Sequence, residues 1–363
     1  MERVRIMDKK LAIYPMTRDA CAVARNSSLL QGHVLSHIFA PRFTELCGTD
    51  ISHIDGGSYA NVSLSDYCCD TLKKIDVLFV DYDENLKTLS LYNDIIDEAI
   101  MFDKKVICSR KLVQQLRKEP IPRPYDVSHT EKSPDMNRLY EIPIPVITVL
   151  TQGERADQFA VELALRKYFI DEGYTVSQLG SYEASQFFGF NNLPNFLFEP
   201  HEAYEKALLF NHYVRGLVEK EESHLLILGV PGGIMKYNDQ LLNGLGLLPV
   251  TVCGAVRGDL SILCMYHAQY NELFFDEMSR YGLYRYGTPI NFFNVANTHF
   301  TPKLDNSYMK MFVDLKSDYV LRSIRQDIKH GEHNLCNVLD SDSAKNTCRA
   351  VHEALLNNVR YVK

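Results

Sequence analysis

Apolar residues in the first third of the chain follow two patterns that alternate along the sequence. Short apolar runs at residues 11–15, 34–39, 76–80 and 105–108 predict β-strands. Between them, apolar residues recur every three or four positions, which predicts helices at residues 17–30, 65–74, 89–101 and 111–118. Thr17 and Asp19 are the candidate N-caps of the first helix, and Ser65 is the expected N-cap of the second. Strands that alternate with helices form parallel βαβ units, so residues 1–118 are predicted to be a Rossmann-like, doubly wound α/β domain.

Residues 119–145 interrupt this alternation. Six prolines fall there among charged residues, at positions 120, 122, 124, 134, 143 and 145. Because proline fixes φ and lacks a backbone donor, this density excludes a regular helix or strand. The segment is predicted to be an interdomain linker.

The alternation of strands and helices resumes after the linker. Apolar runs predict strands at residues 145–150, 174–179, 225–230, 260–264 and 290–295. Helical spacing predicts helices at residues 159–172, 200–222 and 271–281. We therefore predict a second doubly wound parallel-sheet domain over residues 146–300 and a mainly helical C-terminal segment over residues 301–363.

Composition narrows the class of protein. The 363 residues are 46% hydrophobic and 23% charged, which is typical of a globular chain with two domains. Lys and Arg total 39 against 46 Asp and Glu, and the net charge of -7 argues against a nucleic-acid partner. No signal-peptide core and no apolar run of about 18 residues occur, so neither secretion nor a membrane is expected. The nine cysteines are odd in number and scattered, as in a reducing cytoplasm, where we expect this chain.

The strand at 145–150, the turn at 151–158 and the following helix have the layout of a phosphate-binding loop. In such a loop, backbone N–H groups and the helix dipole surround the phosphates, a Lys neutralises charge, and a Ser or Thr holds magnesium. Gly153 stands at the first glycine position. The second glycine, the lysine and the hydroxyl are replaced by Asp157, Gln158 and Phe159.

These replacements remove the groups that nucleoside triphosphate hydrolysis needs. Asp157 brings negative charge to an anion site, and Gln158 supplies no cation, although Arg155 could compensate from another geometry. Two interpretations stay open. One is retained phosphate or nucleotide binding by Gly153, Arg155 and Gln158, with ATP or GTP and Mg²⁺ as the cofactor. The other is a purely structural turn.

A second glycine-bearing turn follows the predicted strand at 225–230. Gly232 and Gly233 would allow close approach of the backbone to a ligand, or a positive φ. Lys236, Tyr237 and Asn238 add a cation, a hydroxyl and an amide. A ligand-binding loop and a tight structural turn both fit this pattern.

Acidic residues supply the remaining candidates. Asp259 precedes the predicted strand at 260–264 and fits either a metal ligand or a turn residue. In the first domain, Asp50, His53 and Asp55 combine ligand types for a metal. Asp50 and His53 are an odd number of residues apart, which keeps them off a common face of an extended chain, so no metal site is predicted.

Several segments between residues 11 and 300 carry a family resemblance: Tyr14–Arg18, Asp50–Gly57, Gly173–Ser181, Phe187–Phe190 and Gly229–Asn238. They resemble bacterial peptide maturation system proteins, which are encoded beside small Cys-rich precursor peptides and radical S-adenosylmethionine maturases, mainly in Clostridia and relatives. The resemblance implies a role in making a ribosomally synthesised, post-translationally modified peptide, without a known reaction. It also implies a P-loop NTPase-like second domain, in which members of the family keep a Lys at the position of Gln158.

The sequence therefore supports two main hypotheses. The first is an accessory protein that binds a precursor peptide, its radical S-adenosylmethionine maturase, or both. The second is a nucleotide-dependent ligase or kinase-like enzyme with a remodelled phosphate loop, in which Arg155 or Lys236 is the cation and Asp259 a metal ligand. Gln158 argues against the second hypothesis. A regulatory sensor of small molecules is a third hypothesis, and a homo-oligomer stays open.

Overall fold

The computed structural model describes residues 8–42, 44–86, 88–116, 137–302, 310–327 and 333–360. Contacts divide the chain into two compact units. The first unit comprises residues 1–55, 59–128 and 183–189, and the second comprises residues 56–58, 129–182 and 190–363. Most of the predicted linker at 119–145 lies outside the described residues.

The first unit is built around a five-stranded parallel sheet with the strand order β3-β2-β1-β4-β5. Its strands are β1 (Lys9–Tyr14), β2 (His33–Ala40), β3 (Ser65–Asp66), β4 (Val77–Val80) and β5 (Lys105–Cys108). Its helices include α1 (Arg18–Arg25), α2 (Ser52–Asp55), α3 (Cys69–Lys73), α4 (Leu89–Met101) and α5 (Arg110–Leu116). All of β4 and the last four residues of β1 are buried, as expected for central strands of a parallel sheet. The predicted α/β class is confirmed.

Local signals explain where the first helices begin. The Thr17 hydroxyl accepts a hydrogen bond from the Ala20 N–H at 3.1 Å, which confirms Thr17 as the N-cap of α1. The prediction for Ser65 was wrong. Ser65 lies in β3, which pairs with Phe39 of β2, and helix α3 begins only after Cys68.

The second unit contains a seven-stranded sheet, parallel throughout, with the order β14-β11-β10-β6-β9-β7-β8. Its strands are β6 (Val146–Thr151), β7 (Val176–Gly180), β8 (Asn191–Asn192), β9 (Leu225–Gly233), β10 (Leu260–Met265), β11 (Ile290–Val295) and β14 (Asn334–Cys336). Strands β12 (Thr298–Pro302) and β13 (Lys310–Asp314) form a separate antiparallel pair. The helices include α6 (Gln158–Asp171), α7 (Ala203–Glu221), α8 (Leu247–Ala255), α9 (Glu272–Tyr286), α10 (Ser317–Asp327) and α11 (Ser341–Arg360).

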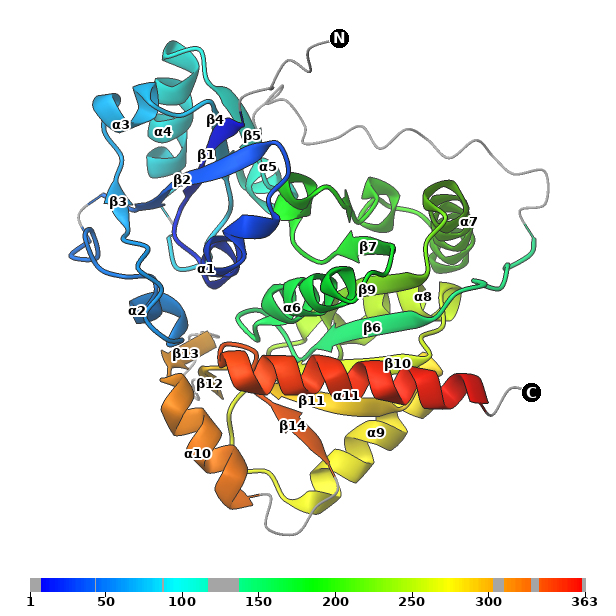
Figure 1. Cartoon of the computed structure of the whole chain (residues 1–363). Helices are drawn as coiled ribbons and strands as arrows, with labels where there is room; N and C mark the ends of the chain where they lie inside the picture. The colour runs from blue at the N-terminus through cyan, green and yellow to red at the C-terminus, as the bar shows by residue number, and fades with distance from the viewer. Residues whose placement is uncertain are drawn as a thin grey trace. The chain divides into compact units, whose positions relative to one another are not determined.

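Helices cover both faces of this second sheet (Figure 1). Helices α6 and α11 pack on one face, where Leu165 and Val351 join Ile147 of β6 in a buried cluster. Helices α7, α8 and α9 cover the other face, where Phe210 joins Leu150 of β6 in a second cluster. Apolar residues of β6 alternate between the two clusters, so this central strand packs against apolar side chains on both faces of the sheet. Groups of β6 that could contact a ligand therefore lie at the ends of the strand.

The C-terminal segment is part of the second unit and not a separate helical appendage. Strand β14 adds to the edge of the sheet by pairing with β11, and Leu355 of α11 lies in the same buried cluster as β6. Helices α10 and α11 make up most of the described part of residues 301–363, as expected of a mainly helical segment, and β13 and β14 add short strands there. Residues 183–189 group with the first unit, where the Glu183 carboxylate accepts the Arg110 N–H at 2.7 Å.

Two chain-wide features agree with the composition. In the described part of the chain, no helix combines the length and apolar character that a bilayer crossing needs. All nine cysteines are free thiols, and six of them are buried.

Candidate functional site

The phosphate-loop layout lies at the middle of the second sheet. Strand β6 has β10 on one side and β9 on the other, and its carboxyl end continues into residues 152–157 and then into α6. From β9 the chain crosses over β6 to β10. Ligands of open α/β sheets bind outside the carboxyl ends of the strands at such a point, so this is where a nucleotide would be expected.

The loop at residues 151–158 is folded onto its own backbone at its start. The Thr151 hydroxyl donates to the Gly153 carbonyl at 2.7 Å and accepts the Gly153 N–H at 3.1 Å. Arg155 and Asp157 both have positive φ angles, of 62° and 60°. These are conformations that glycine adopts readily and that cost energy for other residues.

Asp157, at the second glycine position, is turned into the protein. Its side chain is buried, and its carboxylate accepts the Asn297 N–H at 3.2 Å. The negative charge that the sequence placed near an anion site is therefore held by a backbone donor from the segment after β11. A negative charge at the start of α6 attracts N–H donors of the protein and repels a phosphate.

Gln158 does not point into an open anion site. Its side-chain amide donates to the Val149 carbonyl and to the Val230 carbonyl, both at 2.8 Å. The β6–β9 ladder is irregular at this point, because Val149 faces Gly229 while Thr151 faces Gly233. The glutamine amide thus donates hydrogen bonds to both strands where the register between β6 and β9 shifts. The lysine of a working phosphate loop does not have this role.

Aromatic side chains cover the loop. A Cβ atom placed on Gly153 would lie 1.8 Å from the Tyr237 hydroxyl and 2.6 Å from the Tyr266 hydroxyl, so only glycine fits there. The two hydroxyls are 3.1 Å apart, and Tyr266 also donates to the Glu154 carbonyl at 2.7 Å. The Phe300 ring stacks beside both tyrosines, with centroid distances of 4.6 and 5.3 Å.

Burial sets the protonation of this aromatic cover. It raises the pKa of Tyr237 and raises the pKa of Tyr266 much further, with the neighbouring Tyr237 adding to the effect on Tyr266. Both phenols therefore stay neutral at physiological pH. They act as hydrogen-bonding groups that hold the loop, and not as charges that could attract or repel a ligand.

The cations beside the loop are engaged by carboxylates of the protein. Arg155 contacts both carboxylate oxygens of Asp314 at 2.9 Å, and Lys310 contacts Glu154 at 2.8 Å. Each of these side chains is between a quarter and a third exposed, so a strongly charged ligand could compete for them. Arg155 is therefore near the loop as expected, but it faces the β12–β13 pair.

The second predicted loop packs directly against the first. Gly233 is the last residue of β9, and a Cβ atom on it would lie 1.8 Å from the side-chain amide nitrogen of Asn243. That amide donates a hydrogen bond to the Gln152 carbonyl of the first loop at 2.7 Å. Gly232 has a φ of 81° and is exposed. Of the predicted residues in this turn, Tyr237 is brought to the loop at 151–158 and covers it.

Lys236 and Asn238 serve the turn itself. Lys236 forms an ion pair with Asp239, three residues later. The Asn238 side chain accepts the backbone N–H groups of Gln240 and Leu241 at 2.8 and 2.7 Å. This is the local side chain-to-backbone pairing that stabilises turns.

Asp259 is at the other end of the sheet. Its carboxylate accepts the Val146 N–H at 2.8 Å, at the start of β6, whereas the loop follows the end of β6. The intervening strand is about 16 Å long at roughly 3.3 Å per residue. The structure thus does not bring Asp259 together with the loop, and it corrects the expectation that this residue is a metal ligand there.

The acidic group of the first unit is structural. Asp50 accepts N–H groups from Ser52, Ala60 and Val62 at 2.9 to 3.1 Å. Burial alone would raise the pKa of Asp50, but these hydrogen bonds outweigh it and lower the pKa to about 2. Asp55 pairs with Arg25 at 2.6 Å. Within the described residues, no group of three or more potential ligands is placed to hold a metal ion.

Comparison with known proteins bears on the fold. No protein-family model matches the sequence, and no curated protein matches it. Among solved structures, a DUF1611 family protein from Anabaena variabilis is similar over 95% of this chain and 99% of its own, with a TM-score of 0.58 and 11% identity. A pseudomurein peptide ligase type C from Methanothermus fervidus covers 72% of this chain and 38% of its own, with 10% identity and a TM-score of 0.26, which is too low to carry an argument.

These similarities concern the fold alone. The topology and the similarity to the DUF1611 family protein define a protein of two parallel-sheet α/β units, consistent with a Rossmann-like and P-loop-like α/β fold. Sequence patterns did not point to four residues outside the turn that contact its loop, namely Tyr266, Asn243, Asn297 and Phe300. They come from distant parts of the chain, and each is ordinary in its local context.

Proposed function

We propose that this protein is a non-hydrolytic accessory protein in the maturation of a ribosomally synthesised peptide, and that its second unit is a scaffold and not a nucleotide site. The observation that carries the scaffold role is the Gln158 amide, which bonds to the Val149 and Val230 carbonyls where a phosphate-binding lysine would stand. The role in peptide maturation is supported by the family resemblance of five sequence segments. The proposed place of action is the cytoplasm.

The physical argument compares what a triphosphate needs with what the loop offers. A phosphate site presents backbone N–H groups and a cation to an open space. Here Tyr237 and Tyr266 cover Gly153, and Lys310 is paired with Glu154. A triphosphate would have to displace the phenols and compete with the carboxylate, and no lysine at position 158 would compensate for that cost.

Calorimetric titration with ATP and GTP, each with and without Mg²⁺, tests the scaffold role. We expect no binding by the wild type, and a gain of binding only in a variant that both restores the cation and opens the cover, Gln158→Lys with Tyr237→Ala. Gln240→Lys is the matched control, because it adds the same charge at an exposed position of the same unit. Micromolar binding by the wild type, about -8 kcal/mol, would overturn the scaffold role and favour a nucleotide-dependent ligase or kinase-like enzyme.

The role in peptide maturation has its own test. We expect the gene for this chain to lie beside genes for a small Cys-rich peptide and a radical S-adenosylmethionine maturase. The labelled Cys-rich peptide should then bind the purified protein in a fluorescence anisotropy titration, or the protein should copurify with the maturase. If neighbouring genes of this kind are absent, or neither partner binds, this role is refuted whatever the nucleotide result.

A further inference from the structure

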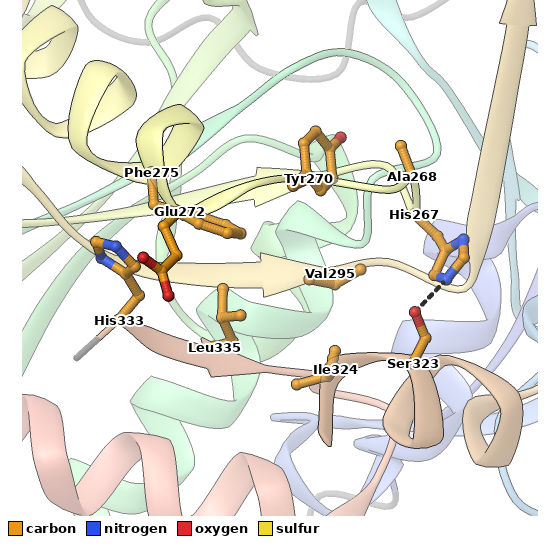
Figure 2. Close-up of a pocket in the computed structure, with 10 residues that line it drawn as sticks. All are labelled: His267, Ala268, Tyr270, Glu272, Phe275, Val295, Ser323, Ile324, His333 and Leu335. Atoms are coloured by element: carbon orange, nitrogen blue, oxygen red, sulfur yellow. Dashed lines mark hydrogen bonds between the residues drawn. The ribbon is translucent and has the colours of Figure 1, made fainter. Parts of the chain in front are cut away.

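A second candidate site, a pocket, lies beside the carboxyl ends of β10 and β11 (Figure 2). The residues that line it come from the segment after β10, from α9, β11 and α10, and from the start of β14: His267, Ala268, Tyr270, Glu272, Phe275, Val295, Ser323, Ile324, His333 and Leu335. The carboxyl edge of a parallel sheet is where α/β folds bind ligands. The pocket is thus in a position to bind one, although the loop over β6 is filled.

The middle of the pocket is apolar. Figure 2 shows Val295, Ile324 and Leu335 between its two polar ends, with the Phe275 ring beside them. The space that the centres of water-sized molecules can reach is about 30 Å³. A single water needs about 10–15 Å³ by the same measure, so the hollow has room for two or three water-sized groups, the size of a small aliphatic group. A nucleotide base is too large for it.

The two polar ends differ in charge. At one end, His267 Nε2 and Ser323 Oγ lie 3.0 Å apart, and neither group carries a fixed charge. At the other end, Glu272 carries the fixed charge among the described residues that line the pocket, and His333 lies 3.8 Å from the Asp276 carboxylate. Whether His333 is neutral or protonated, the two carboxylates give the described residues of this end a net negative charge.

Glu272 is placed to meet a ligand at the mouth of the pocket. Its side chain is exposed, and it forms no hydrogen bond or ion pair with any other described residue. The other acidic group at this end, Asp276, is next to Phe275 on the same helix, α9. An incoming cation would therefore find an available carboxylate at the mouth and apolar surface behind it.

We propose that this pocket binds a primary ammonium group carried on a small branched apolar body. The body packs against Val295, Ile324 and Leu335, and the ammonium group pairs with Glu272. Such a ligand could be a free aliphatic amine or amino-acid amide, or the N-terminal Val, Leu or Ile of a peptide. The site does not depend on the nucleotide loop; with a peptide ligand, it would also specify how the proposed accessory protein holds its partner.

Ligand-observed NMR titration of the full-length protein tests this site. The probes are leucinamide, N-acetyl-leucinamide, which lacks the ammonium group, and the peptide Leu-Gly-Gly. We expect leucinamide or the peptide to bind with a millimolar Kd, and the acetylated probe to bind much more weakly. Tighter binding of Leu-Gly-Gly identifies a peptide N-terminus as the ligand, and binding of leucinamide alone identifies a free small molecule.

Two variants locate the binding. Glu272→Gln should weaken binding about two- to fivefold, the upper part of the range for an exposed ion pair. Glu277→Gln on the same helix is the matched control and should have no effect, because Glu277 does not line the pocket. Ala268→Leu fills the hollow from a partly exposed loop position and should abolish binding.

Three results would overturn the proposal. They are equal binding of the acetylated and free probes, unchanged binding by Ala268→Leu, and no binding of either ammonium probe at concentrations well above the millimolar range. A circular dichroism spectrum identical to that of the wild type shows that the Ala268→Leu variant is folded. The pocket proposal can fail in this way while the nucleotide and peptide-maturation tests give their expected results.

Discussion

Replacing Gln158 by leucine removes two hydrogen bonds that join β6 to β9 at the point where their ladder diverges. The Gln158 amide donates to the carbonyls of Val149 and Val230 at 2.8 Å, and the side chains of both valines are completely buried. Leucine keeps about the same volume, so the packing of α6 against the sheet should change little. The change therefore isolates the two hydrogen bonds.

The expected loss follows from those two acceptors. A hydrogen bond of this type contributes about 0.5–1.5 kcal/mol net, and a buried carbonyl left without a donor costs about 1–3 kcal/mol. Because both hydrogen bonds are only partly buried, we expect the free energy of unfolding of the second unit to fall by about 1–3 kcal/mol in Gln158→Leu, twice the net value of one bond. Gln158→Glu is isosteric with the native residue but places a carboxylate against both carbonyls, so it should destabilise the unit more at neutral pH.

Urea unfolding and amide hydrogen exchange together measure this effect. Exchange of amides in β6 and β9 should accelerate in Gln158→Leu, while amides of the first unit should keep their wild-type rates. Gln240→Leu, at an exposed turn position, is the control and should change the free energy of unfolding by less than about 0.5 kcal/mol. A similarly small change in both Gln158 variants would refute the idea that this side chain joins the strands, and would leave it available to a ligand.

Two further predictions concern other parts of the chain. Gly153→Ala should lower the melting temperature sharply, because its Cβ would lie 1.8 Å from the Tyr237 hydroxyl. Adding Tyr237→Phe removes that hydroxyl and should recover part of the loss. No recovery would contradict the packing of the tyrosines over the loop. Asp50 has its pKa lowered from 3.8 to about 2 in the folded protein, so its stabilising effect is complete above the unfolded value and is lost as pH falls from about 4 to 2. Urea unfolding between these pH values should therefore show a weaker pH dependence in Asp50→Asn, and an unchanged dependence would contradict the assigned hydrogen bonds.

Periodicity predicted most of the sheet strands and long helices, because burial of one face leaves a regular signal. The predicted strand at 105–108 and helix at 89–101 coincide with β5 and α4. Helix α8 (Leu247–Ala255) was missed because it is apolar almost throughout and contains Pro249, so it has neither helical spacing nor a polar face. Strand β14 has three residues, too few for any pattern.

The state of the loop could be predicted only in part. Sequence comparison with a working phosphate loop identified the three replaced positions, including Gln158, because each position has a chemical requirement. It could not reveal the cover, because Tyr237, Tyr266 and Phe300 meet only through the fold. Asp259 is a different case. Its position just before a strand left a metal ligand and a turn residue open, and the direction of that strand places it at the far edge of the sheet, away from the loop.

The filled loop and the pocket occupy neighbouring stretches of the same carboxyl edge, and tyrosines connect them. Tyr270 lines the pocket and donates to the Tyr266 carbonyl at 2.8 Å, while the Tyr266 N–H is held by the Gln152 side chain at 2.9 Å. Burial raises the pKa of Tyr270 to about 12, so this link is neutral as well. Over β6 the edge is thus packed with protein groups, and over β10 and β11 it is hollow and bears a carboxylate. The proposed ammonium site therefore lies at β10 and β11, next to the edge over β6 where a phosphate loop would bind an anion.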